Sequence, residues 1–235
     1  MSHIVSSYDT ELEKLRNMIA EMGGISEEML AKGIESFVER DVELARTVIA
    51  MDKKLDALQR DIEERAVLTI ARRQPMAVDL RETIASIRIS GDLERIGDLA
   101  KNLAKRAIAT HNQLELLPVV KNLQYMAHLA AAQLKDVLDA YARHDIALAM
   151  DVWQRDSAID TLNSSMFREV LTYMMENPRI ITYCTHIMFC SKNIERIGDH
   201  TTNIAETVYY HQTGEIMPDE RPKMDSTSTL ITTDE

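Results

Sequence analysis

Acidic side chains spaced four residues apart are the residues of this chain best suited to chemistry. Two carboxylates at this spacing lie on one face of a helix, where they repel each other by about 0.2–0.5 kcal/mol. A patch of four such groups offers only oxygen ligands, which suit hard cations such as magnesium, manganese, calcium or iron. The simpler alternative is that these acids merely solvate an exposed helix face. The pairs concerned are Asp52/Asp56, Glu94/Asp98, Asp156/Asp160 and Glu195/Asp199.

The four pairs occupy equivalent places in two halves of the sequence. Residues 92–105 read DLERIGDLAKNLAK and residues 193–206 read NIERIGDHTTNIAE, so that Glu94 recurs 101 residues later as Glu195. The pair at Asp52 recurs in the same way, 104 residues further along the chain. Self-similarity at a fixed offset indicates a duplicated structural unit. Isolated acidic pairs occur by chance in an acidic protein, whereas pairs that recur in both halves indicate a shared role.

Two other residue types accompany the repeated acids. Asn102 and Asn203 lie one helical turn further along and could add neutral amide oxygens to a metal site. Gly97 and Gly198 lie between the paired acids, where a glycine costs a helix about 0.8–1 kcal/mol relative to alanine. Their matched placement indicates that a metal cluster or a neighbouring helix approaches the backbone closely.

Long helices are expected to position these residues. The chain contains only 7 Gly and 5 Pro, and its stretches between prolines carry helical periodicity without strand-like alternation. Asp41 and Asp145 suit the N-caps of the second and fifth helices, and Pro75 and Pro178 suit the first turns of the third and sixth. The predicted helices span 10–38, 41–72, 76–111, 117–142, 145–175 and 178–212.

The duplication predicts an all-α fold of two tandem, structurally similar three-helix bundles with long antiparallel helices. We expect the first repeat at 1–114 and the second at 115–213. From Gly214 onward the chain loses its helical period and is rich in Pro, Asp, Glu, Ser and Thr. This composition predicts a disordered acidic tail at 214–235.

The apolar seam of the third predicted helix indicates where the acids point. Ile89, Leu93 and Ile96 alternate in steps of four and three residues, which is the pattern of a face packed on partner helices. At 100° per residue, Glu94 and Asp98 project away from that seam. We therefore expect the carboxylates on the bundle surface. If the second and third helices lie side by side, their pairs converge on one patch per bundle.

Bulk composition excludes several classes of protein. The net charge of −11 argues against a general nucleic-acid binder, which needs a basic surface. Cys184 and Cys190 lie in an apolar helical pattern and match no metal-knuckle spacing, so we expect two reduced thiols in a cytoplasmic protein. No apolar run reaches the roughly 18 residues that span a bilayer. Any membrane association is expected to go through a partner.

No catalytic residue is assigned. Ferritin-like di-iron enzymes use a Glu-x-x-His motif in the bundle core, and none of the 7 histidines has a glutamate three residues before it. The histidines also fail to align between the two halves. His200 is adjacent to Asp199, but its counterpart in the first half is Leu99.

A basic segment, ARRQPMAVDLR at residues 71–81, joins the second and third predicted helices. It has no equivalent in the second half. One interpretation is that Arg72 and Arg73 complement the carbonyl end of a helix. The other is a partner-docking site unique to the first half.

The chain resembles the PhoU family of bacterial phosphate-signalling proteins. The resemblance covers about residues 10–212 and rests on RQPMAVDLR at 73–81, on the two ERIGD segments and on the tandem duplication. It implies two similar three-helix bundles and a regulator that is not an enzyme. Within the segment 73–81, our candidates for partner binding are Arg73, Asp79 and Arg81.

The resemblance further implies partners and a cofactor. Such proteins link the ATPase of the phosphate ABC importer to a sensor histidine kinase, and they repress phosphate uptake and the phosphate-starvation response when phosphate is plentiful. They are expected to act as homodimers. Their repeated acidic motifs bind metal clusters, one per bundle, described with iron or zinc, and manganese or magnesium would also suit the ligands. Carried over, these motifs fall on the eight acids identified above.

Two other functions remain open at this point. A metal-dependent carboxylate-cluster enzyme needs an enclosed pocket with an open coordination position. A metal-free helical scaffold needs only the packing of the helices.

Overall fold

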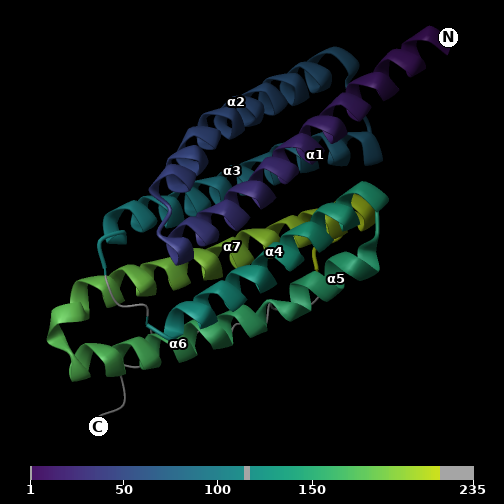
Figure 1. Ribbon diagram of the computed structural model, residues 1–235. Coiled ribbons are helices and arrows are strands. Elements are labelled where there is room, and N and C mark those ends of the chain that lie inside the picture. Colours follow the sequence, from purple (N-terminus) through teal and green to yellow (C-terminus); the bar gives the residue numbers. More distant parts are fainter. Residues whose placement is uncertain (1, 114–116, 218–235) are drawn as a thin grey trace.

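The computed structural model describes residues 2–113 and 117–217, and within these ranges every regular element is helical (Figure 1). Long helices run side by side along the molecule in two groups of three. The elements are α1 (Ser2–Glu39), α2 (Val42–Arg73), α3 (Val78–Thr110), α4 (Val119–Arg143), α5 (Ile146–Arg155), α6 (Ser157–Glu176), the 3₁₀ turn η1 (Pro178–Ile180) and α7 (Ile181–Thr213).

Each half of the chain forms one three-helix unit, as the duplication predicted. In the first repeat α1, α2 and α3 all pack on one another. In the second, α4 and α7 pack together and the segment α5–α6 covers both. The two repeats meet through α3 against α7 and through α1 against α4. The all-α architecture of two tandem helical units is therefore confirmed.

Both predicted aspartate N-caps are present. The Asp41 carboxylate accepts hydrogen bonds from the amides of Glu43 and Leu44, each at 2.9 Å. Asp145 accepts in the same way from the amide of Leu148 at 3.0 Å. These bonds satisfy first-turn donors that a helix cannot satisfy by itself, so they fix the starts of α2 and α5.

Two details of the predicted helices are wrong. The expected fifth helix is interrupted at Asp156, so that α5 ends at Arg155 and α6 begins at Ser157. Pro75 lies outside α3, because the backbone turns left-handed at Gln74 (φ 48°) and has a positive φ again at Ala77 (φ 49°) before the helix begins. Pro178 does open a helical segment, although that segment is the short η1 turn.

The apolar seam packs as the sequence predicted. Ile89, Leu93 and Ile96 are fully buried, and each such side chain contributes about 1.5–3 kcal/mol by leaving water. Gly97 lies beside this seam and faces Leu55 of α2. A Cβ at this position would meet Leu55 Cδ2 at 2.1 Å, so only a glycine fits without a shift of its neighbour. In the first repeat, therefore, the neighbouring helix explains the glycine. Both cysteines are buried and free, in agreement with reduced thiols.

Some predictions fall outside the described residues. The expected boundary between the repeats at 114/115 lies there, as does the segment 218–235 of the expected tail. Gly214, where the tail was expected to begin, closes α7 with a left-handed φ of 80°. Across the described residues, no helix combines the length and the apolar character that crossing a membrane requires.

Candidate metal-binding clusters

The first acidic cluster forms where α2 and α3 lie side by side. Lys101 Nζ lies 2.6 Å from Asp52 Oδ2 and 2.5 Å from Asp98 Oδ1, so that one ammonium joins carboxylates of both helices. Glu94 lies on the same face of α3. The predicted convergence of the α2 and α3 pairs is therefore present in the first repeat, and a lysine is included in it.

Electrostatics places Glu94 within this cluster. Desolvation raises the pKa of its carboxyl, and the negative charges of Asp98, Asp56 and Asp52 raise it further, while Arg95 opposes the shift. A carboxyl whose ionisation is opposed by three neighbouring carboxylates gains most from an additional cation. The four acids of the first repeat thus share one electrostatic environment.

The acids of the second repeat lie on α6 and α7 and at the break before α6. Burial raises the pKa of Glu195; a hydrogen bond from Lys192 opposes this shift, and the charges of Asp199 and Asp160 add to it. Lys192 Nζ lies 2.9 Å from Glu195 Oε1. The other carboxylate oxygen, Glu195 Oε2, is buried and has no hydrogen-bond partner among the described residues.

Gly198 connects the remaining acid to this cluster. A Cβ on Gly198 would meet Asp156 Oδ1 at 2.7 Å, whereas its counterpart Gly97 faces the methyl group of Leu55. The carboxylate of Asp156 therefore rests against the backbone of α7, at the point where α5 gives way to α6. Gly198 therefore makes room for the Asp156 carboxylate and for Ile159 of the neighbouring helix.

The expectation that all eight acids lie on the bundle surface is wrong. Four of them are buried, because adjacent helices cover the groove into which they point: Asp52 (9 % exposed), Asp156 (1 %), Asp160 (2 %) and Glu195 (4 %). A 100° step away from the seam takes a side chain into the cleft between two helices and not out to solvent. Buried carboxylates need compensation, which an ammonium or a metal ion can supply.

The asparagines proposed as additional ligands have different surroundings. Asn203 Nδ2 donates to Asp92 Oδ1 at 3.3 Å, and His200 Nδ1 lies 2.9 Å from the same oxygen. Asn203 is therefore directed across the contact between α7 and α3. Asn102 is partly buried on α3.

The basic segment between α2 and α3 makes contacts within the chain. Arg73 forms an ion pair with Glu11 of α1 at 3.0 Å, and Arg81 Nε donates to the carbonyl of His211 at 3.1 Å. Asp79 lies in the first turn of α3, where its charge complements the helix dipole. Arg81 thus joins the first repeat to the end of α7, in addition to the partner-binding role expected for it.

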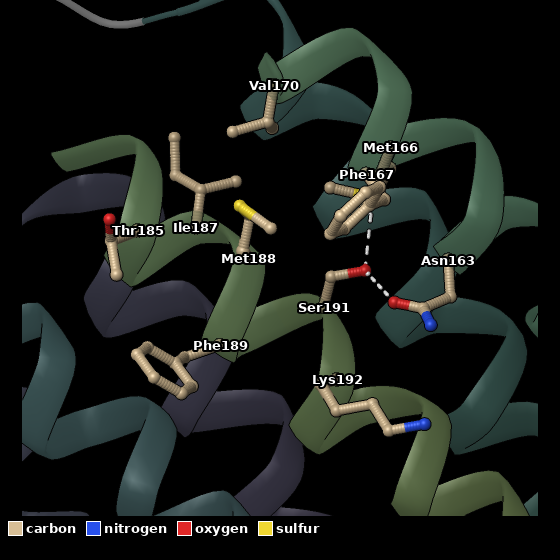
Figure 2. A pocket seen from close by; sticks show the side chains of 10 residues that line it. All are labelled: Asn163, Met166, Phe167, Val170, Thr185, Ile187, Met188, Phe189, Ser191 and Lys192. Atoms are coloured by element: carbon tan, nitrogen blue, oxygen red, sulfur yellow. Dashed lines mark hydrogen bonds between the residues drawn. The ribbon is translucent and has the colours of Figure 1, made fainter. Parts of the chain in front are cut away.

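An apolar groove of about 590 Å³ borders the second cluster (Figure 2). Phe167 of α6 and Phe189 of α7 line it, and Lys192 and Asn163 form its polar end, where Ser191 Oγ donates to Asn163 Oδ1 at 2.7 Å. The sequence analysis missed this groove. Two of the 3 phenylalanines of the chain line this groove, and their presence in the second repeat was the sequence feature that could have indicated it.

The same positions in the first repeat carry charge. The counterpart of Phe167 is Glu63, and that of Phe189 is Arg88, whose guanidinium stacks on Tyr210 at 5.5 Å. The two repeats therefore share a helical arrangement but differ in the side chains that lie beside their acidic clusters.

The carboxylate oxygens of both clusters are ligands that suit a hard cation. The two repeats differ in the groups that lie beside these oxygens. As the side chains stand, no three His, Cys, Asp or Glu side chains within 2–113 and 117–217 are grouped closely enough to hold a metal. In the first cluster the Lys101 ammonium already lies between two carboxylates. In the second, the unpartnered Glu195 Oε2 is an acceptor that a cation would satisfy.

Comparison with known proteins decides the family. The family model of the PhoU domain matches the chain twice, over residues 19–107 and 123–208, one match in each repeat. The chain belongs to the PhoU family. Both PhoU matches contain an ERIGD segment and its pair of acids, so the clusters described above lie within the matched domain of each repeat.

Relatives and solved structures agree with this assignment. A phosphate-specific transport system accessory protein PhoU homolog of Rhizobium meliloti is 53% identical over 229 residues, 97% of each chain. The protein named PhoU from Escherichia coli is 36% identical over 91% of this chain and 88% of its own. The crystal structure of PhoU from Pseudomonas aeruginosa has a TM-score of 0.86 at 36% identity, covering 88% of this chain and all (100%) of that one.

Proposed function

We propose that this chain is a cytoplasmic regulator of phosphate homeostasis that acts by binding partners. It would connect the ATPase of the phosphate ABC importer to the sensor histidine kinase of the phosphate response, and repress both uptake and the starvation response when phosphate is plentiful. The observation that carries this proposal is the match of both repeats to the PhoU domain, with relatives named as accessory proteins of phosphate transport. We further propose that the protein acts as a homodimer and not as a catalyst.

We also propose that the acidic clusters hold metal ions. Asp156, Asp160, Glu195 and Asp199 would provide the oxygen ligands in the second repeat, and Asp52, Asp56, Glu94 and Asp98 those in the first. A bound cation would join α2 to α3 and α6 to α7. It would also offset the burial, and after it the repulsion among carboxylates, that raise the pKa of Glu94 and Glu195. Iron, zinc, manganese or magnesium would serve this structural purpose.

The end of the molecule at the α2–α3 turn is our candidate for the docking of a partner. Leu68, Lys14 and Arg72 line a small hollow of about 240 Å³ between α1 and α2. Nearby Met76 is 81 % exposed. A basic and apolar surface on a chain of net charge −11 suits an acidic partner surface with an apolar centre.

Deleting the gene tests the regulatory role directly. Because the protein is proposed to repress the starvation response, the deletion strain should express a phosphate-starvation reporter at high phosphate, and a plasmid copy of the gene should restore repression. Expression that stays repressed in the deletion strain would contradict the proposal. Affinity purification of the tagged protein in high and low phosphate should recover the importer ATPase and the kinase. Recovery of neither would remove the bridging role.

A further inference from the structure

We propose that the apolar groove between α6 and α7 docks a partner protein, and that its occupant is an amphipathic helix of about 12 residues with an acidic side chain at one end. This inference rests on the proposed function, because a protein that connects two partners needs two separate docking surfaces. The basic hollow between α1 and α2 is our candidate for one of them. The groove, which belongs to the other repeat, would be the second.

Apolar side chains from two helices form the walls of this groove (Figure 2). The lining includes Met166, Phe167 and Val170 of α6 and Ile187, Met188 and Phe189 of α7. Methionine side chains are flexible and polarisable, so they adapt to the shape of a docked apolar side chain. Grooves of this kind receive the apolar face of a helix, whose anchoring side chains recur at i, i+4 and i+7.

Exposed apolar side chains continue the groove beyond its cavity. Leu171 (40 % exposed) and Met175 (84 %) follow Phe167 at intervals of four residues, so that all three lie on one face of α6. At a rise of about 1.5 Å per residue, the stretch from Asn163 to Met175 is about 18 Å long, which matches a docked helix of about 12 residues. A small apolar ligand would fill the cavity but would leave Leu171 and Met175 in water. The extended apolar face therefore favours a helix as the occupant.

Hydrogen-bond donors lie at one end of the groove. The Lys192 ammonium is there, 2.9 Å from Glu195 Oε1, on a side chain that is 47 % exposed. Asn163 lines the same end, and because its Oδ1 accepts from Ser191 Oγ, the other side of its amide presents N–H donors. A carboxylate of a docked helix would accept from this amide and would join the ion pair that Lys192 already makes.

The charge of this part of the chain suits an acidic partner. Residues 161–192, which form most of α6, the turn η1 and the start of α7, contain three basic and two acidic residues, whereas the whole chain has a net charge of −11. Arg196 is exposed on the face of α7 that also carries Phe189 and Lys192. The excess of negative charge elsewhere on the molecule would repel an acidic helix, so charge directs it to this groove.

The first repeat does not offer the same surface. The counterparts of Phe167 and Phe189 are Glu63 and Arg88, and the Arg88 guanidinium stacks on Tyr210. Burying these charged side chains under an apolar helix face would cost free energy. The groove is therefore particular to the second repeat. Glu63 also shows which charged residue this helical arrangement already carries at the position of Phe167.

Two designed peptides test the charge and the helical shape together. Each is a fluorescein-labelled helix of about 14 residues, built on alanine and held helical by a side-chain crosslink, with three leucines at spacings of four and three. One carries glutamate at both ends and the other glutamine. In fluorescence anisotropy, the acidic peptide should bind the full chain about two to five times more tightly than the neutral one. This difference should disappear in Lys192→Gln.

Variants of the groove locate the binding site. Phe167→Glu should weaken binding of the acidic peptide by at least about tenfold, because it places a carboxylate in the apolar wall. Phe189→Gln should also weaken it. Tyr125→Gln is the matched control, since Tyr125 is an aromatic residue of α4 with an exposed fraction of 56 % against 50 % for Phe189. Circular dichroism reports folding, and if Phe167→Glu does not fold, Lys192→Gln and the two peptides still decide the matter.

Several results would overturn the docked helix. Equal affinity of the wild type for both peptides, or equal affinity of the wild type and Phe167→Glu for the acidic peptide, would do so. Binding of sodium dodecanoate but of neither peptide would assign the groove to a small amphipathic ligand. A homodimer that becomes a monomer in Phe167→Glu, measured by analytical ultracentrifugation, would assign the groove to a second copy of the chain.

The repression assay separates this inference from the proposed function. In the deletion strain, a plasmid copy carrying Phe167→Glu should fail to restore repression of the phosphate-starvation reporter, whereas Tyr125→Gln should restore it. Full repression by Phe167→Glu would overturn docking in the groove and leave the regulatory role intact. A deletion strain that stays repressed would instead remove the regulatory role, whatever the peptides do.

Discussion

Asp156 Oδ1 lies so close to the backbone of Gly198 that a Cβ on this glycine would meet it at 2.7 Å. The corresponding atom in the first repeat is a methyl carbon of Leu55, beside Gly97. The glycine of the ERIGD segment therefore has a different neighbour in each repeat. In the first repeat it serves helix packing, and in the second it admits a carboxylate.

Substitution of Gly198 should affect metal binding. In Gly198→Ala the new methyl group would displace the Asp156 carboxylate, so we expect manganese(II) affinity to fall by about tenfold or more. Isothermal titration calorimetry measures the change. Gly91→Ala is the matched control, because a Cβ there meets no described atom within 4 Å. Unchanged affinity in Gly198→Ala would show that Asp156 is not a ligand.

Substitution of Gly97 should affect stability. A methyl group at this position would collide with Leu55, which is fully buried, and overpacking of this kind costs about 1–3 kcal/mol. Removing a helical glycine returns about 0.8–1 kcal/mol. We expect Gly97→Ala to lower the free energy of unfolding by about 1 kcal/mol and Gly91→Ala to raise it by a similar amount. Urea denaturation distinguishes the two, and a stabilised Gly97→Ala variant would contradict the packing account.

Arg81 should contribute to the contact between the repeats. Its Nε donates to the carbonyl of His211, and its guanidinium packs against Gly214 at the end of α7. Loss of a hydrogen bond from a charged donor predicts that Arg81→Ala lowers the free energy of unfolding by about 1–2 kcal/mol. Arg72→Ala, at an exposed position of the same segment, should leave stability unchanged in the same denaturation experiment. Equal effects of the two substitutions would argue that Arg81 has no structural role.

His211 should make stability depend on pH. Burial lowers the pKa of this imidazole, although the negative charge of Glu82 partly opposes the shift. At pH values above the unfolded-state pKa of about 6.5 both states are neutral, so the full stability is present. As pH falls from there toward the lower folded-state pKa, the unfolded state binds the proton first and the free energy of unfolding decreases.

Replacing this histidine should remove part of that dependence. His211→Gln should flatten the fall in melting temperature between about pH 6.5 and pH 5, the range in which the unfolded state gains its proton. His128→Gln, at an exposed position of α4, is the matched control and should leave the fall unchanged. An identical pH profile for wild type and His211→Gln would show that another group titrates.

Metal removal should destabilise the protein. A ligand that binds only the folded state stabilises it by about 2.7 kcal/mol at a free concentration 100 times its dissociation constant. Adding a chelator to metal-loaded protein should therefore lower the melting temperature in differential scanning calorimetry, and restoring metal should reverse the change. A double variant, Glu94→Gln with Glu195→Gln, should show neither effect. Insensitivity of the wild type to both additions would contradict binding at the clusters.

The fold followed from the sequence because its signals were redundant. Proline positions, helical periodicity and the duplication all indicated the same two helical units, and Asp41 and Asp145 are the caps that their types predicted. The break at Asp156 was not predictable, since the apolar period continues across it. Pro75 was misplaced because a proline can stand at the first turn of a helix or just before it, and only the backbone at Ala77 distinguishes the two.

The acidic residues of the candidate site could be predicted from the sequence, but their burial and their pairing with Lys101 could not. Lys101 joins Asp52 of α2 to Asp98 of α3, as the expected packing of these helices allows. The burial of the acids depends on how closely neighbouring helices approach, which a helical wheel does not show. Lys101 was visible in the sequence three residues after Asp98, a spacing at which side chains meet. It was overlooked because its role depends on Asp52, which lies on another helix.

Anomalous diffraction from crystals grown with manganese(II) tests the central claim most directly. We expect one anomalous peak between α6 and α7, beside Glu195 and Asp199, and another between α2 and α3, beside Glu94 and Asp98. No peak at either cluster, at manganese concentrations that saturate the protein in solution, would contradict their assignment as metal sites.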